Sequence, residues 1–475
     1  MTKVAGPTTG PTVAEILDSH LHGSGSPTRT ARAVLDAIEA RGDDGTWLST
    51  VPRDELLAAA ADLEDRSDTR DLPLYGVPFG VKDSIDVAGV PTTLSCPAYA
   101  YVPDTTAPVV QRLLDAGALY VGKTNLDQFA TGLNGTRTPF TIPRGVFGNG
   151  MISGGSSSGS ALAVARGDVP FAVATDTAGS GRVPAALNGI VGYKPSRGLI
   201  STVGLVPACK SLDCITAMTS TIDDMDRVMD VMIGRDDADP WSRDPGPRHS
   251  GDTLTIGLPA PDELEFFGDE AMREAHLSFR ARLSHLAVPG GVEIVDVSLT
   301  PFLAAGELLY SGPWVAERLV EFARFLAERP DDIHPVVRDI LRSGEKYSAV
   351  DAFSALQRLQ ELRAEVGRLW QQMDVLVVPT IGRTFTVDEV LAEPIAVNTM
   401  LGHYTHFGNL LDLTGVAIPQ GLTADGRPHS AMLLGNALTD DAVLHLAAAL
   451  LDEPRSRPAI PDRSSRTSTA TVSHP

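Results

Sequence analysis

The chain has 475 residues, with 39 Lys and Arg against 60 Asp and Glu and a formal net charge of −21. This excess of negative charge excludes nucleic acid and anionic membranes as expected partners, because both are bound through Lys and Arg that neutralise phosphate. With 43% hydrophobic and 21% charged residues, the composition is that of a globular enzyme and excludes a disordered chain.

Helices and strands alternate along the first half of the chain. Apolar residues at helical spacing predict two early helices, and short apolar runs predict buried strands between later helices. A Gly/Ser-rich run then interrupts the alternation at residues 148–159. The elements expected around it are helices near 31–38 and 56–63, a strand ending at Lys82, a helix at 109–116, a strand at 119–121, a helix at 161–166 and a strand at 171–174.

The second half continues the alternation. Its expected elements are a strand LTIGL after residue 253, a helix at 270–288, a strand VEIVDV, long helices across 303–328 and 348–372, and a strand at 375–378. This pattern predicts an α/β fold with a mixed sheet covered by helices. We expect an N-terminal helical segment at 1–70, a main domain at 71–452, and a tail at 453–475, which is rich in Ser, Arg, Pro and Thr and predicted to be disordered.

The cysteines and the apolar runs indicate the compartment. Cys96, Cys209 and Cys214 form neither a CxxC pair nor an even disulfide framework, which fits a reducing environment. No apolar run is long enough for a signal peptide or a membrane-spanning helix. We therefore expect a cytoplasmic protein.

Three residues in separate segments are candidates for catalysis: Lys82 in VPFGVK, Ser156 in GGSSSG and Ser180 in TDTAGSGR. Considered singly, Lys82 would be a surface lysine, Ser156 part of a flexible linker and Ser180 part of a turn. Together they indicate chemistry, because the apolar residues before Lys82 would desolvate its ammonium and lower its pKa, the condition for a lysine base near neutral pH.

The turn that carries Ser180 follows the strand at 171–174. It presents four successive backbone N–H groups that can form an oxyanion hole, those of Thr177, Ala178, Gly179 and Ser180. Glycines in and around this turn and the Gly/Ser run permit positive φ and close backbone approach.

Two other interpretations of the Gly/Ser run are weaker. A phosphate-binding loop needs a lysine that GGSSSGSA lacks. A nucleophile elbow is matched in letters by GSSSG, centred on Ser157, but no apolar strand leads into it. No histidine lies between His22 and His249, so the lysine is the more plausible base.

From about residue 76 to residue 435 the chain resembles the amidase signature family. The resemblance is carried by GVPFGVKDSIDVAGVPTT, VGKTNLDQFATGLNGT, GGSSSGSALAVA, TDTAGSGRVPAALNGIVGYKPSRG, DVLVVPT and LLDLTGVAIPQGL. It implies a central mixed, twisted β-sheet covered by helices on both faces. It also implies Ser180 as nucleophile, Ser156 as bridging serine after a cis Gly155–Ser156 bond, Lys82 as base, no metal, no cofactor and a homodimer.

Within the family, NLDQFATGLNGTRTPF, AGSGRVPAA, VPACKSLDC and YSGPWVAER resemble allophanate hydrolases. This subgroup implies Tyr310 and Arg318 as the pair that binds the substrate carboxylate, and Gly132 as a further substrate contact. A planar guanidinium suits that role because it can hold a carboxylate through two hydrogen bonds. Without the resemblance, Arg318 reads as a solvated helix residue that pairs with Glu321.

The implied reaction is hydrolysis of the terminal amide of allophanate (urea-1-carboxylate), a small anion, in urea or s-triazine (cyanuric acid) degradation. It releases ammonia and N-carboxycarbamate, which decarboxylates without catalysis. Many allophanate hydrolases carry a further C-terminal domain, which we expect to be absent here. The alternatives are an amidase of another small amide and a glutamyl-tRNA amidotransferase A-type subunit.

Several polar residues near these motifs remain ambiguous. Arg182 either contacts substrate or holds the nucleophile loop through Asp176. The side chains of Asn125, Asp127 and Gln128 either cap loops or line the pocket. We expect Cys209 and Cys214 to be small buried thiols, and His403 and His406 to serve packing or pocket shape, not metal binding.

Overall fold

The computed structural model describes residues 10–66, 68–148, 150–247, 253–286, 291–310 and 312–455. Within this part of the chain, one 11-stranded sheet has the order β1-β3-β2-β4-β6-β5-β10-β11-β9-β7-β8. The strands are β1 (Trp47–Thr50), β2 (Pro78–Lys82), β3 (Leu119–Thr124), β4 (Phe171–Asp176), β5 (Val191–Lys194), β6 (Cys214–Thr219), β7 (Leu254–Leu258), β8 (Val292–Asp296), β9 (Val375–Pro379), β10 (Thr414–Leu422) and β11 (Pro428–Gly435).

The sheet is mixed, which confirms the predicted class of fold. Strands β3, β2 and β4 are parallel neighbours, and so are β9, β7 and β8. The central strands from β4 through β6, β5, β10 and β11 to β9 pair antiparallel, as does β1 with β3 at one edge.

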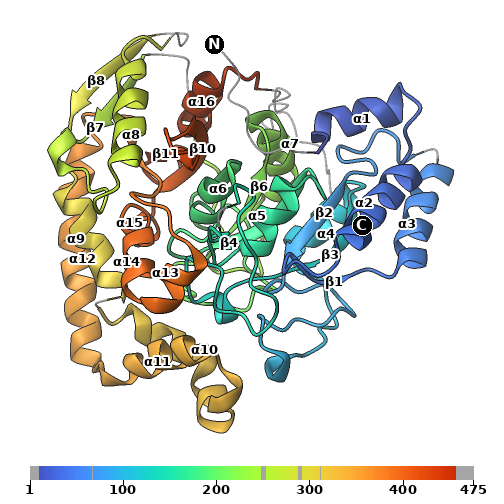
Figure 1. Cartoon of the computed structure of the whole chain (residues 1–475), viewed down its shortest axis with the longest axis horizontal. Helices are drawn as coiled ribbons and strands as arrows, with labels where there is room; N and C mark the ends of the chain where they lie inside the picture. Colours follow the sequence, from blue (N-terminus) through green and yellow to red (C-terminus); the bar gives the residue numbers. More distant parts are fainter. Residues whose placement is uncertain are drawn as a thin grey trace, which may run out of the picture.

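Helices flank this sheet along its whole length, with α1–α3 at one end and α8, α9 and α12 at the other (Figure 1). The described helices are α1 (Val13–Leu21), α2 (Pro27–Arg41), α3 (Arg53–Asp65), α4 (Pro108–Asp115), α5 (Ser158–Ala165), α6 (Val183–Asn188), α7 (Ile222–Met232), α8 (Glu270–Leu283), α9 (Thr300–Tyr310), α10 (Trp314–Glu328), α11 (Pro335–Ser343), α12 (Ala349–Leu369), α13 (Val387–Ala392), α14 (Ala396–Gly402), α15 (His406–Leu410) and α16 (Asp440–Leu451). Among the described residues, none of the helices is long and apolar enough to cross a membrane.

Strand β4 shows how the two faces of the sheet are covered. Successive side chains of a strand point to opposite faces. Phe171 and Val173 join a core with α4, α7 and α16, whereas Ala172 and Ala174 join a second core with α2, α3 and α5. The predicted cover of helices on both faces is therefore confirmed, and β4 is buried on both sides where it delivers the site residues.

The N-terminal segment is not purely helical. Between α2 and α3 it contributes β1, whose Ser49 pairs with Lys123 of β3. At the other end, the predicted tail begins at residue 453, but Glu453 accepts a hydrogen bond from the Ile222 amide and Arg455 forms an ion pair with Asp226. The rest of that predicted tail lies outside the described residues.

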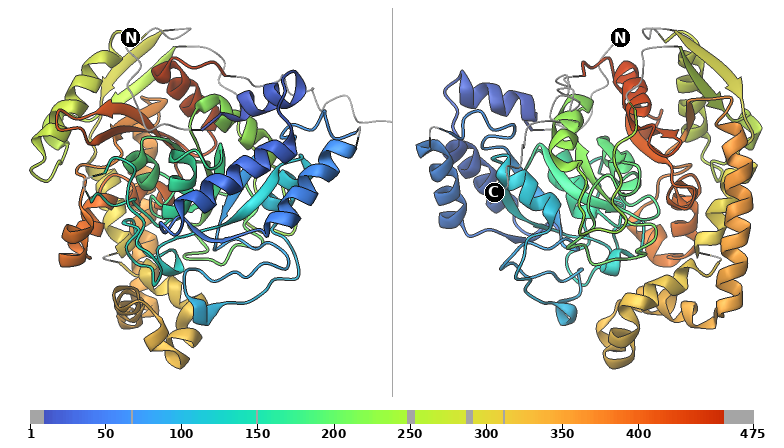
Figure 2. Two further views of the ribbon diagram at one scale, coloured as in Figure 1. Left: turned by 45° about the vertical axis from the view of Figure 1, so that its right-hand side comes forward. Right: turned by 180° about the vertical axis from the view of Figure 1, so that it is seen from behind.

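The single long helix expected across 303–328 is wrong. The chain forms two helices there, α9 and α10, which are separated by a break that contains Gly312 and Pro313. Proline in a helix interior removes a hydrogen bond and clashes with the preceding turn, so the second helix begins directly after it. By contrast, α12 is one continuous helix along the outer edge of the molecule, as its unbroken sequence predicts (Figure 2).

Candidate active site

Lys82 is the last residue of β2 and is fully buried. Because β2 and β4 are parallel neighbours, their carboxyl ends meet at one edge of the sheet, and this brings the Lys82 amine within reach of Thr175. Its Nζ donates hydrogen bonds to Oγ of Ser156 at 2.8 Å, Oγ of Ser157 at 2.9 Å and Oγ1 of Thr175 at 2.6 Å. Among the residues that the structure describes, the amine thus faces three hydroxyl groups and no carboxylate at hydrogen-bonding distance.

Burial sets the charge state of this amine. Loss of solvation lowers the pKa of Lys82 to about 7, although Asp127, Asp213 and Asp176 act in the opposite direction. A lysine that titrates near neutral pH is deprotonated in a large fraction of molecules and can accept a proton. The burial of Lys82 and the direction of its pKa shift agree with what the apolar residues before it predict.

The loop before α5 holds Ser156. The Gly155–Ser156 peptide bond is cis, as predicted. A side chain at Gly155 would collide with Oδ2 of Asp127 and with the Gly135 nitrogen, so only glycine fits. Asp127 also donates its backbone N–H to the Ser156 carbonyl oxygen at 3.0 Å. This loop is therefore fixed by direct contact with the segment that follows β3.

Ser180 lies in the turn between β4 and α6. Ser180 is 2% exposed, and its hydroxyl donates no hydrogen bond to any described protein group. The turn is held by Asp176, the last residue of β4, which accepts from the amides of Gly179 at 2.8 Å and Gly181 at 3.0 Å. Thr177, at the start of the turn, donates its hydroxyl to Asp213 at 2.5 Å.

The predicted oxyanion hole needs one correction. The amide of Gly179 donates to Asp176 and so already has a partner. The amides of Thr177, Ala178 and Ser180 donate to no other protein atom within the described ranges. These three are the donors that remain for a developing negative charge on a substrate oxygen.

Arg182 holds the nucleophile loop, which resolves its ambiguity against substrate contact. Its Nε and Nη2 each donate to the Asp176 carboxylate at 2.9 Å, and Nη2 also contacts the Thr405 carbonyl and Oδ1 of Asn409. Both members of the ion pair are completely buried. The guanidinium is therefore committed to protein groups.

The pair expected to bind the substrate carboxylate, Tyr310 and Arg318, lies together with Gly132, the further expected substrate contact. Arg318 of α10 is 2% exposed and donates Nη1 to Oγ1 of Thr131 at 2.8 Å, directly before Gly132. Its guanidinium carbon lies 5.9 Å from the ring centroid of Tyr310, the last residue of α9. The alternative that Arg318 is a solvated helix residue paired with Glu321 is wrong, because Arg318 is buried.

Asn125, Asp127 and Gln128 prove to be loop-organising residues. Asp127 accepts hydrogen bonds from the amides of Asn134, Gly135 and Arg137, at 3.2, 3.1 and 2.9 Å. Asn125 donates to the Gly45 carbonyl, and Gln128 accepts from the His334 amide. These contacts shape the turn that carries Gly132.

Cys209 and Cys214 are buried free thiols, as expected, and His406 packs against Tyr310. His406 is buried, with its ring 4.9 Å from that of Tyr310, and burial lowers its pKa to about 3, so it is neutral there. Among the described residues no group of three His, Cys, Asp or Glu side chains is arranged to hold a metal ion.

Three polar residues of this region escape sequence reasoning. Ser157 and Thr175 share the Lys82 amine with Ser156, and Arg137 lies buried under the turn of Gly132. Ser157 was visible as part of the Gly/Ser run, but the run alone does not show which hydroxyl faces the lysine. Arg137, in the segment TRTPF, carries no signal that distinguishes a buried arginine from a surface one.

The fold and this constellation define an amide-bond hydrolase, and the chain belongs to the Amidase family, whose model matches residues 29–444. It is 41% identical over 446 residues to the urea amidolyase of Saccharomyces cerevisiae, which covers 92% of this chain but 24% of that protein. The chain thus spans about a quarter of the length of the urea amidolyases it matches.

The chain is also similar to a solved allophanate hydrolase structure and to an amidotransferase subunit. The structure of the allophanate hydrolase of Kluyveromyces lactis superposes with a TM-score of 0.87 at 39% identity, over 94% of this chain and 73% of that chain. The A-type subunit of the glutamyl-tRNA(Gln) amidotransferase of Natronomonas pharaonis is 34% identical over 416 residues, which is 80% of this chain and 96% of that protein.

Proposed function

We propose that this protein hydrolyses the terminal amide of allophanate through a Ser180–Ser156–Lys82 triad. The observation that carries the proposal is a buried guanidinium, Arg318, beside Tyr310 and the turn of Gly132, in a protein that also holds a buried lysine whose pKa is about 7. Asp213 links the proposed triad to Arg318. It accepts a hydrogen bond from the hydroxyl of Thr177 in the nucleophile loop, and its charge acts on both Lys82 and Arg318. Similarity to an allophanate hydrolase supports this choice of substrate.

In the proposed reaction, Ser180 Oγ attacks the amide carbonyl carbon and passes its proton to Ser156, which passes its own proton to the neutral Lys82 amine. The free amides of Thr177, Ala178 and Ser180 stabilise the negative charge that develops on the carbonyl oxygen. The relay requires the Ser180 hydroxyl to turn toward Ser156 when substrate binds, since catalytic hydrogen bonds tighten in the substrate complex.

The second half of the reaction reverses the relay. The proton on Lys82 returns through Ser156 to the leaving nitrogen, the C–N bond breaks, and ammonia departs from an acyl-enzyme on Ser180. Water, deprotonated by the same relay, then attacks the ester carbonyl and releases Ser180. The product is N-carboxycarbamate, which decarboxylates in solution, so the step would serve urea or s-triazine degradation.

The anionic end of the substrate is held by Arg318. A buried guanidinium gains more from a carboxylate than an exposed one does, because water no longer screens the charges. In a protein with a net charge of −21, such a local cation is needed to attract a small anion. Tyr310 completes the proposed contacts with the carboxylate, and Gly132 is a further proposed contact with the substrate.

The test is the substrate profile of the purified protein. We expect kcat/KM to be highest for allophanate, lower for malonamate and biuret, and lowest for a neutral aryl amide. A preference for neutral or bulky amides would overturn the proposal. Light scattering and fractionation of the host cell test the associated expectations of a homodimer and a cytoplasmic location.

A second candidate is the A-type subunit of a glutamyl-tRNA amidotransferase. It is favoured by relatives of that name, which are 34% identical to this chain and are matched over 96% of their length. Glutaminase activity that arises only with partner subunits would support it. Hydrolysis of allophanate by this chain without partners would exclude it.

A further inference from the structure

A second arginine, Arg137, packs against the turn of Gly132 and is buried without an ionic partner among the described residues. The residue is 1% exposed. Its Nη1 donates to the Thr131 carbonyl and its Nη2 to the Pro394 carbonyl, both at 2.9 Å. Its Nε–H is buried and has no hydrogen-bond partner within the described part of the chain. Two neutral carbonyls therefore hold this cation, and one of its three nitrogen atoms, Nε, has no partner within the described part of the chain.

Arg137 and Arg318 converge on one residue. The Thr131 carbonyl oxygen accepts from Arg137, and the Thr131 hydroxyl accepts from Arg318 at 2.8 Å. The two guanidinium groups therefore flank the same turn, next to Gly132. In the described ranges, neither arginine has a carboxylate within ion-pair distance.

The electrostatics of Arg137 are unfavourable without a ligand, whereas, despite burial, nearby acidic groups, Asp213 among them, raise the pKa of Arg318. Burial lowers the pKa of Arg137, Asp127 partly offsets that effect, and the charge of Arg318 lowers it further. The Asp127 carboxylate is already occupied by three backbone amides. Buried like charges without a paired anion are costly, and proteins keep them where they serve a ligand.

A second unpartnered nitrogen lies in the same region. Nδ1 of His334 is buried and has no partner among the described residues. Burial lowers the pKa of His334, and the nearby Arg137 charge lowers it further, although Asp127 acts in the opposite direction. Two buried polar atoms without partners, one on Arg137 and one on a histidine that senses the Arg137 charge, indicate a place for a polar, negatively charged molecule.

We propose that Arg137 and Arg318 together form the anion site, in which Nε–H of Arg137 donates to the carboxylate of a short carboxylate ligand. The inference rests on the proposed function only for the identity of the substrate, because the site itself is defined by its two cations. A purely structural role for Arg137 is met by its two Nη contacts and leaves Nε–H unexplained. Arg137 thus determines specificity for anionic over neutral amides.

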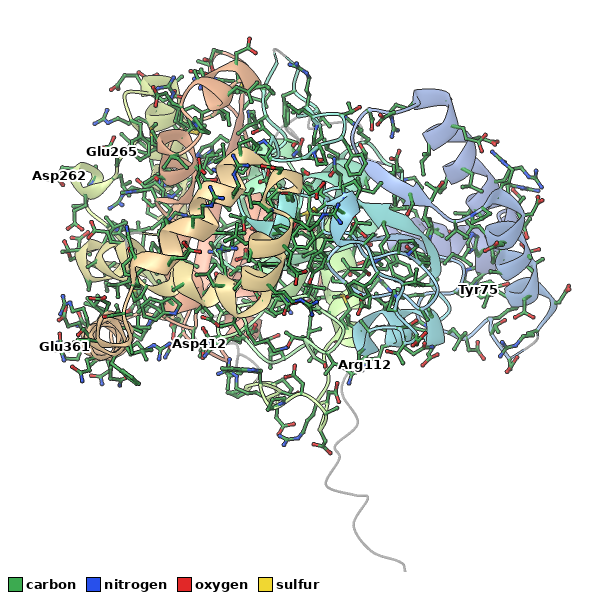
Figure 3. All side chains as sticks on the ribbon, turned by 90° about the horizontal axis from the view of Figure 1, so that it is seen from below. Tyr75, Arg112, Asp262, Glu265, Glu361 and Asp412 are labelled. Carbon is green, nitrogen blue, oxygen red and sulfur yellow. The ribbon has the colours of Figure 1, made fainter. Side chains whose placement is uncertain are left out.

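Arg112 of α4, labelled in Figure 3, supplies a matched control. Its guanidinium also donates to backbone carbonyls, those of Met232, Gly234 and Arg235. It lies outside the substrate pocket and its loss removes the same kind of contacts. Arg112→Gln therefore measures what such contacts contribute to folding alone.

Malonate is the probe, because it carries a carboxylate one atom from a second carbonyl carbon, as allophanate does, and it is not hydrolysed. Calorimetric titration of the full-length Ser180→Ala protein gives its Kd. We expect Arg137→Gln to raise this Kd about tenfold or more, the scale of a lost charge-assisted hydrogen bond. Arg137→Lys, which keeps the charge but loses the Nε–H donor, should raise it less, and Arg112→Gln should leave it unchanged.

An unchanged Kd in folded Arg137→Gln, or in Arg137→Lys should the glutamine variant fail to fold, would overturn the inference. So would a Ser180→Ala protein that binds no malonate. Malonate binding that depends on Arg137, in a wild-type protein that does not hydrolyse allophanate, would support the anion site and contradict the proposed substrate. If allophanate is hydrolysed, Arg137→Gln should raise KM for allophanate more than KM for a neutral amide.

Discussion

Asp176 and Arg182 form a buried ion pair that closes the loop carrying Ser180. The carboxylate binds Nε and Nη2 of the arginine at 2.9 Å each and also accepts from the amides of Gly179 and Gly181. One side chain at the end of β4 therefore fixes both the shape of the turn and the direction of the amides that remain free in it.

Breaking this pair should cost both stability and activity. Arg182→Met leaves the Asp176 charge buried and unpaired, which typically costs about 3–5 kcal/mol. We expect chemical denaturation to show a loss of that order, together with reduced kcat. A double-mutant cycle with Asp176→Asn should give a large coupling energy. Additive effects of the two substitutions would show that the pair does not hold the loop.

Removing the Ser180 hydroxyl should abolish turnover and spare the fold. The hydroxyl donates no hydrogen bond within the described chain, so Ser180→Ala removes no such protein contact. We expect kcat to fall by about 10⁴-fold or more, with a thermal transition close to that of the wild type. Ser158→Ala is the control, because Ser158 donates to the Asn125 carbonyl and not to Lys82. A large loss of stability in Ser180→Ala would make the serine structural.

The reaction should require the neutral form of Lys82. Because burial lowers its pKa to about 7, the base is protonated below that pH and free above it. We therefore expect kcat/KM to rise with pH through about 7 and then level off. Lys82→Arg, which remains charged at all these pH values, should be inactive. A rate that is independent of pH from 5 to 9 would contradict the assignment of the base.

Asp213 offers a sharper test of the same base. Its negative charge raises the pKa of Lys82, against the larger effect of burial. Removing that charge in Asp213→Asn should lower the pKa and move the midpoint of the kcat/KM profile to lower pH. A midpoint that moves upward or stays fixed would show that the profile does not report Lys82.

Arg318 should discriminate between charged and neutral substrates. Arg318→Ala is expected to raise KM for allophanate or malonamate by about tenfold or more, with a much smaller effect on a neutral amide. Arg324→Ala is the control on the same helix, since Arg324 is largely exposed and pairs with Glu328. Equal effects on charged and neutral substrates would remove the carboxylate role of Arg318.

The sequence predicts those site residues whose type and local sequence context indicate a catalytic role. A lysine after an apolar strand and serines in Gly-rich turns were recognisable, and so was the cis bond before Ser156 through the family motif. Arg137 was not, because nothing local shows that a loop arginine is buried. Strands β10 and β11 were also missed, since Pro419 and Gly421 interrupt the first, and its pairing with β11 is a contact that only the assembled sheet defines.

Asp127 contacts both the turn expected to bind substrate and the loop that carries Ser156. Its carboxylate shapes the turn of Gly132 and Arg137, while its amide holds the carbonyl of Ser156. Substitutions that reshape that turn for a larger substrate would therefore also displace Ser156 of the proton relay. Such variants would gain selectivity but lose kcat. Helices α9 and α10, which carry Tyr310 and Arg318, make no hydrogen bond to Ser156 among the described contacts. Substitutions there are therefore the less costly route to new substrate preferences.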